Sequence, residues 1–257
     1  MDIKNKSEEL GTTAQTLLGV QNLQTMKNLP AETILSASAS LGHPFGPNID
    51  GELIPNNLTQ LLEEGSFNNI DLIIGSNKNE DYMYIDENVT ANDIDKLIER
   101  YYPEHKDTLL ALLDLEDPRL AMDHLTTNQV TLCPSVFIAR SLAKNGNNVY
   151  QYHFTRRREG SEKILSYHGA EIPYVFDTHD EWLPTNEDDI ELTKAMMEYW
   201  VEFAKKGTPN SINNPTWKEF GVEENYLILD QSLENSSKLE SDFCKIMIDE
   251  MVQRASR

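Results

Sequence analysis

The chain has 257 residues and carries 43 acidic against 22 basic side chains, which gives a net charge of -21 and a sequence pI near 4.6. Such a charge repels phosphate backbones and anionic lipid surfaces, so a nucleic-acid partner is not expected. A hydrophobic content of 39% is ordinary for a folded domain, and no apolar run reaches the ~18 residues of a membrane span. The first residues lack the apolar segment of a secretory signal.

The N-terminal third of the chain is predicted to form short helices. Three helical stretches cover residues 8–40, and the third opens with Pro30, which suits a first helical position. Residues 42–55 are rich in glycine and proline and are predicted to be a series of turns. A further short helix follows, with Asn57 as its N-cap and Gly65 as its stop.

The rest of the chain alternates strands with long helical stretches. The helical stretches are residues 90–145, residues 187–206 and the tail from Leu239, and the strands lie around residues 71–74, 148–154 and 226–229. This alternation predicts an α/β fold with a mainly parallel sheet. Only about three strands are evident, which is few for a complete doubly wound domain of this length.

The helix at 187–206 is the best defined in the sequence. Its apolar residues recur at helical spacing and form one stripe, made up of Leu192, Ala195, Met196, Tyr199, Trp200 and Phe203. Acidic residues occupy its first turn and lysines its last, and Gly207 with Pro209 ends it. We expect this stripe to pack in the core and not to bind a cofactor.

The basic residues and the cysteines give weaker signals. Arg156-Arg157-Arg158, which Glu159 follows, is predicted to be a solvated loop in preference to an anion site. Cys133 and Cys244 are too few for a disulfide scaffold or a self-contained zinc site, and their spacing alone favours two buried free thiols. The six histidines are scattered, so no metal is expected.

Two titratable residues stand just beyond predicted strands. Glu80 lies in the segment IGSNKNEDYMY after the strand at 71–74, and His168 follows the strand at 148–154 across a polar loop. The carboxyl ends of strands are where α/β proteins build their sites. An acid followed by a histidine, each after a strand, also fits the last two positions of a serine–acid–histidine triad. The spacing alone is weak evidence in so acidic a chain.

Five segments together resemble the C-terminal half of a type-B carboxylesterase, the cholinesterase-like group of α/β-hydrolases. They are LPAETILSAS, FGPNIDGELIP, FNNIDLIIGSNKNED, HGAEIPYVF and FAKKGTPNSINNPTWKEF, and the resemblance runs from about residue 8 to residue 246. It implies that His168 is the catalytic histidine and Glu80 the triad acid, with Glu171 as a supporting glutamate. It implies no cofactor and no metal.

The resemblance also changes the interpretation of the two cysteines. The segments around Cys133 and Cys244 are similar to the two that a C-terminal disulfide joins in cholinesterases. The resemblance thus implies a Cys133–Cys244 bond and an oxidising compartment, secreted or periplasmic, for the intact parent.

The nucleophile of such a triad is not found in this sequence. No G-x-S-x-G occurs, and neither Ser76 nor Ser166 has the glycines of a nucleophile elbow. We therefore expect residues 1–257 to form the C-terminal portion of a single α/β-hydrolase domain, with disorder at 1–7 and 252–257. Its partners would be a carboxylic ester and the missing N-terminal half, which would lie upstream of Met1. The chain would be inactive alone.

Three alternatives remain open at this point. The chain could be a non-catalytic adhesion or binding module of the cholinesterase-like type, although retention of Glu80 and His168 argues against this. It could be one half of a split esterase that a separate N-terminal chain complements. It could also be a degenerate fragment with no activity.

Overall fold

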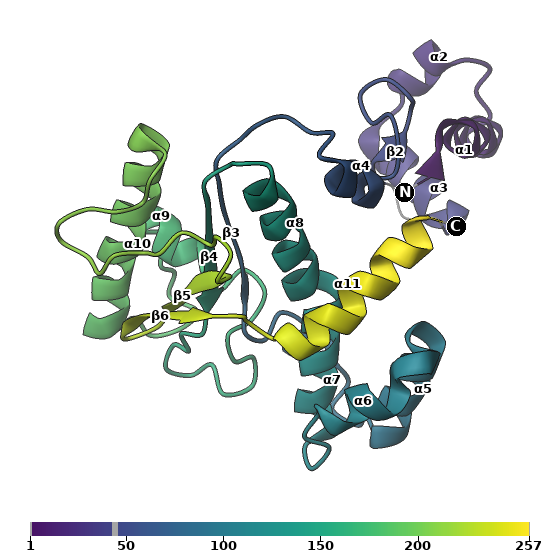
Figure 1. The fold of residues 1–257 in the computed structure, drawn as a ribbon. Coiled ribbons are helices and arrows are strands. Elements are labelled where there is room, and N and C mark those ends of the chain that lie inside the picture. Colours follow the sequence, from purple (N-terminus) through teal and green to yellow (C-terminus); the bar gives the residue numbers. More distant parts are fainter. Residues whose placement is uncertain (1, 43–45, 257) are drawn as a thin grey trace. The chain divides into compact units, whose positions relative to one another are not determined.

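The computed structural model describes residues 2–42 and 46–256, so residues 43–45 of the predicted turn region, like residues 1 and 257, lie outside the described residues. The chain divides into two compact units, Met1–Glu64 and Gly65–Arg257 (Figure 1). Disorder at 1–7 and 252–257 stays a prediction, although α1 begins at Lys4 and α11 ends at Ala255.

The first unit consists of short helices and a small two-stranded pairing. Its strands β1 (Asp2–Ile3) and β2 (Asn48–Ile49) pair in parallel, and its helices are α1 (Lys4–Leu17), α2 (Leu23–Lys27), α3 (Ala31–Leu41) and α4 (Leu58–Glu64). The predicted cap is confirmed, since the Asn57 side chain accepts a hydrogen bond from the Thr59 N–H at 2.9 Å. Among residues 6–42 and 46–64 of this unit, no side chain is buried.

A four-stranded sheet forms the centre of the second unit. Its order is β3 (Leu72–Asn77), β4 (Val149–Phe154), β5 (Asn225–Leu229) and β6 (Leu233–Ser237). The first three strands are parallel, with Asn77 beside Phe154, and β6 returns antiparallel to β5. The three predicted strands and the α/β architecture are confirmed. The strand β6 was not predicted, because its sequence LENSS lacks an apolar alternation and it pairs on one side only.

Helices cover both faces of this sheet. The helices are α5 (Ala91–Tyr101), α6 (Lys106–Ala111), α7 (Pro118–Thr127), α8 (Cys133–Lys144), α9 (Ile172–Phe176), α10 (Glu187–Lys206) and α11 (Ser241–Ala255). Short 3-10 turns lie at η1 (Tyr82–Tyr84) and η2 (Pro103–His105), and a π-helical turn, η3 (Asn128–Leu132), connects α7 to α8. In Figure 1, α9 and α10 lie on one side of the sheet and α8 lies on the other.

The core on the α10 side confirms the predicted apolar stripe. Leu192, Met196 and Tyr199 of α10 pack with aromatic side chains of β4 and with the fully buried Trp217. Close packing on the sheet also explains why a glycine occupies position 75 of β3, because a Cβ atom there would come within 2.5 Å of the ring of Tyr152, its neighbour on β4. The sheet therefore presents a continuous aromatic face to α10.

The arginine cluster corrects one prediction from the sequence. Arg156 does not lie in a solvated loop: its Nε donates to the buried Asp189 carboxylate at 2.8 Å. Arg158 is only 6% exposed and donates to the main-chain oxygens of Pro184 and Asp180. Only Arg157 is exposed, because the loop before α10 supplies oxygen acceptors that no sequence pattern indicates.

Candidate active site

Glu80 stands in the turn that follows β3, and its carboxylate is almost completely buried, with a residue exposure of 5%. Its Oε1 accepts a hydrogen bond from the Asn77 main-chain N–H at 2.8 Å, and its own N–H donates to Thr127 Oγ1 at 3.1 Å. Burial raises the pKa of Glu80, against the lowering effect of the Asn77 N–H and of His168. The side chain is therefore held in one orientation at the carboxyl end of the strand.

His168 lies in the loop between β4 and α9. The buried Ser166 fixes this loop, since its main-chain oxygen accepts the Asn79 N–H at 3.1 Å and its hydroxyl lies 2.8 Å from the Thr155 oxygen. Asn79 is the residue before Glu80, so the loop that carries the histidine is tied directly to the turn that carries the acid. The His168 side chain itself is 67% exposed.

The structure brings Glu80 and His168 together across 88 residues of chain. His168 Nδ1 lies 2.7 Å from Glu80 Oε2. This hydrogen bond to Glu80 raises the pKa of His168, and the charge of the carboxylate adds to the effect. Because an ionised carboxylate only accepts, Nδ1 carries the proton in this pair, which leaves Nε2 of the neutral ring free to act as a base.

Glu171 contacts the same group of residues through Asn77. The buried Asn77 side chain donates to the Tyr167 main-chain oxygen at 2.8 Å and to Glu171 Oε2 at 2.5 Å. The Glu171 carboxylate also raises the pKa of His168. Asn77 was not singled out from the sequence. Its position as the last residue of the strand that precedes Glu80 was the signal that could have identified it.

Neither candidate serine completes a triad. The Ser166 hydroxyl is buried against main-chain oxygens, and Ser76 precedes Asn77 in β3, so its side chain points to the opposite face of the sheet. Within the described part of the chain, the His168 ring hydrogen-bonds to Glu80 and to no serine. The arrangement supplies a base and its orienting acid.

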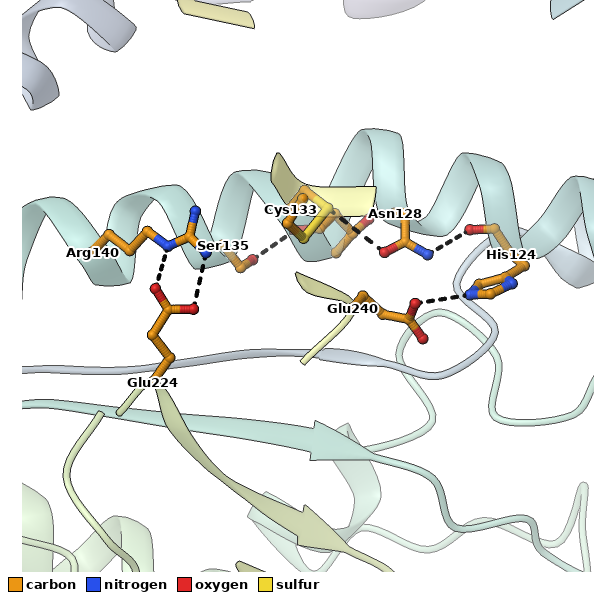
Figure 2. The surroundings of a disulfide bond; sticks show 9 residues. His124, Asn128, Cys133, Ser135, Arg140, Glu224 and Glu240 are labelled. Atoms are coloured by element: carbon orange, nitrogen blue, oxygen red, sulfur yellow. Dashed lines mark hydrogen bonds and ion pairs between the residues drawn. A yellow bond between two sulfur atoms is a disulfide. The ribbon is translucent and has the colours of Figure 1, made fainter. Parts of the chain in front are cut away.

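Cys133 and Cys244 form a disulfide, as the resemblance implied, and the two free thiols favoured by spacing alone are not observed. Their Cα atoms lie 4.9 Å apart, and the bond joins the first residue of α8 to α11. Figure 2 shows two side-chain contacts near the bond, the ion pair of Arg140 with Glu224 at 2.6 Å and a contact of His124 Nε2 with the Glu240 carboxylate at 3.2 Å. These contacts tie the α7–α8 segment to the residues that precede β5 and α11.

The described residues contain no group of histidine, cysteine and acidic side chains arranged to hold a metal ion. None of the helices within residues 2–42 and 46–256 is long and apolar enough to cross a membrane.

Comparison with known proteins identifies the family. The family model for the carboxylesterase family matches residues 3–247. The chain is 28% identical to Carboxylesterase 1E of Mus musculus over 254 aligned residues, which cover 88% of this chain and 44% of that relative. It is 31% identical to Neuroligin-3 of Mus musculus over 198 aligned residues, which cover 65% of this chain and 24% of that relative.

Solved structures show the same fold. A PNB esterase superimposes with a TM-score of 0.77 at 20% identity, covering 95% of this chain and 55% of that chain. The carboxylesterase EST55 of Geobacillus stearothermophilus gives a TM-score of 0.76 at 19% identity, covering 96% of this chain and 55% of that chain. The chain thus spans less than half the length of the curated relatives and about half that of the solved structures. It has an α/β-hydrolase fold and belongs to the carboxylesterase family.

Proposed function

We propose that this protein serves in carboxylic ester hydrolysis by a serine esterase mechanism, for which it provides the histidine and the acid. The observation that carries the proposal is the 2.7 Å contact between His168 Nδ1 and the buried Glu80 carboxylate. Membership of the carboxylesterase family supports the reaction class.

The roles of the two residues follow from their chemistry. A serine hydroxyl attacks the ester carbonyl while His168 Nε2 accepts its proton, and the imidazolium then donates that proton to the departing alcohol. Glu80 fixes the tautomer and stabilises the positive ring. Water, activated by the same histidine, then releases the acid from the acyl-enzyme.

We place the nucleophilic serine and the oxyanion hole outside the printed sequence, in the remaining half of the domain. The printed sequence has no G-x-S-x-G, and a histidine–glutamate pair without a nucleophile has nothing to deprotonate. The chain alone is therefore inactive.

Two exposed features of the second unit support a missing half. Among the described strands, β3 is an edge strand with no partner on its outer side. Apolar side chains of α9 and α10 line a hollow of about 510 Å³, and Phe176 there is 68% exposed. Both features are surfaces that the rest of an α/β-hydrolase domain would cover.

The disulfide supports a secreted or periplasmic location for the intact parent, because such bonds persist in oxidising compartments.

A second candidate function is a non-catalytic binding module with the esterase fold. The 31% identity to Neuroligin-3, a relative that is not named as an esterase, favours it. In that case the Glu80–His168 pair would serve stability only.

The coding sequence upstream of Met1, translated in every frame, separates the candidates. A Gly-x-Ser-x-Gly segment in frame or in an adjacent gene supports the esterase, and an elbow with its serine replaced supports the binding module. The encoded segment should then be co-expressed with this chain, or fused to it in frame, and assayed with p-nitrophenyl acetate.

We expect hydrolysis by the complex, and we expect His168→Gln to reduce kcat by about 10²–10⁴-fold, as for loss of a general base. His105→Gln is the matched control, because His105 lies in η2 and makes no contact with Glu80. The 257-residue chain alone should give no turnover above free imidazole. Turnover by the isolated chain that His168→Ala abolishes would contradict the assignment of the serine to another segment.

A further inference from the structure

The turn that carries Glu80 is held by side chains of α7, which lie 42 to 47 residues further along the chain. The Glu80 N–H donates to Thr127 Oγ1 at 3.1 Å, and Thr127 is buried, with an exposure of 2%. The Thr127 hydroxyl in turn donates to Asp123 Oδ1 at 3.1 Å. The last residue of α7 therefore fixes the main chain of the acid itself.

Asp123 holds the residues on either side of Glu80. Its Oδ2 accepts the Asn79 side-chain amide at 2.7 Å, and its Oδ1 accepts the Asp81 N–H at 3.1 Å. Three consecutive residues of the turn thus depend on two side chains of α7. Because main-chain donors that lose a buried partner cannot turn to water, these bonds strongly restrict the position of the turn.

Arg119 extends the same contact surface to the following residues. Its Nε donates to the Ile85 main-chain oxygen at 3.2 Å, and its guanidinium lies 4.3 Å from the centroid of the Tyr82 ring. Arg119, Asp123 and Thr127 follow one another at four-residue intervals, which places them on one face of α7. That face of α7 is directed at the turn at residues 79–85.

The buried carboxylate of Asp123 is hard to explain by helix packing alone. Asp123 is 1% exposed, and burial raises its pKa, so an ionised side chain at this position is costly. No lysine, arginine or histidine forms an ion pair with it among the described residues, and apart from Thr127 its hydrogen-bond donors all belong to the turn.

We propose that Asp123 and Thr127 are positioning residues, which hold the turn so that the Glu80 carboxylate stays on His168 Nδ1. This inference rests on the proposed function for its catalytic meaning. The geometry that it concerns can be tested without any ester hydrolysis, so a failure of the esterase proposal and a failure of this one can be told apart.

The test is the titration of His168 in the 257-residue chain, followed by NMR of the histidine ring and assigned with His168→Gln. Glu80, Glu171 and Asp81 are the carboxylates whose charge acts on this ring. Thr127→Val removes the hydroxyl and keeps the side-chain shape. We expect it to move the pKa of His168 downward, toward the value in Glu80→Gln, and we expect Thr127→Ser to restore the wild-type value.

Thr126→Val is the matched control. Thr126 lies on the same helix, but its hydroxyl donates to the main-chain oxygens of Met122 and Asp123, at 2.9 Å and 3.4 Å, and does not contact the turn or the Asp123 carboxylate. This variant should leave the pKa of His168 unchanged. If Thr127 acts through Glu80, then Thr127→Val should also have no effect on His168 when introduced together with Glu80→Gln.

Asp123→Ala provides a second, independent variant, with its folding checked by circular dichroism. We expect it to lower the pKa of His168 in the same direction as Thr127→Val. A wild-type pKa of His168 in both Thr127→Val and Asp123→Ala would overturn the proposal. The proposal would also be overturned if the pKa of His168 fell equally in Thr127→Val and in the control Thr126→Val.

Discussion

The Cys133–Cys244 disulfide should contribute a large part of the stability of the second unit. The two cysteines are 111 residues apart, and both are buried. In the chain-entropy account, cross-linking a loop of this length lowers the entropy of the unfolded state by about 16 cal/mol/K, equivalent to about 4–5 kcal/mol at 25 °C. Measured effects for native disulfides are about 2–5 kcal/mol, so the expected loss lies toward the upper end of that range.

The double variant Cys133→Ala/Cys244→Ala measures this contribution in urea unfolding. All three tryptophans of the chain, Trp182, Trp200 and Trp217, belong to the same unit as both cysteines, so their fluorescence reports the relevant transition. We expect the free energy of unfolding to fall by about 3–5 kcal/mol.

Wild-type protein with the disulfide reduced is the control. Its urea unfolding midpoint should fall to about that of the double variant. If the free energy of unfolding of the double variant lies within about 1 kcal/mol of that of the oxidised wild type, the argument from loop entropy is wrong for this chain.

Two further predictions concern charged groups. Asp189→Ala removes the carboxylate partner of Arg156, whose side chain is 10% exposed and keeps the Asn186 amide oxygen as an acceptor. We expect the free energy of unfolding in urea to fall by about 3–5 kcal/mol, whereas Glu187→Ala, at an exposed neighbouring position, should change it little. The raised pKa of His168 stabilises the folded state fully below the ordinary value of 6.5, and this contribution is lost as pH rises through the folded pKa. The difference in free energy of unfolding between wild type and His168→Gln should therefore shrink as pH rises above 6.5, and a difference that grows instead would contradict the Glu80–His168 pair.

At the candidate active site, the acid and the histidine could be predicted from the sequence, but most of the residues that position them could not. Glu80 and His168 were each recognisable as a residue after a strand, their order fitted an acid and a histidine of a triad, and the resemblance implied the same pair. Of the residues that hold them in place, Asn77 had only its position at the end of the strand before Glu80 as a signal, and Asp123 and Thr127 had none. Polar residues at helical spacing on α7 cannot be told from a solvated helix face in a single sequence, since the difference depends on what packs against them.

Local structure could be predicted from the sequence wherever a short-range cause was sufficient. The apolar stripe of α10, its acidic first turn and Gly207 at its end specify that helix, and the three β-rich runs specify the parallel strands. The tertiary structure alone decided the burial of Arg158, the antiparallel strand β6 and the contact of α7 with the Glu80 turn. Each of these depends on groups that the fold brings together from separate elements, and burial gives a polar side chain a partner that local spacing does not reveal.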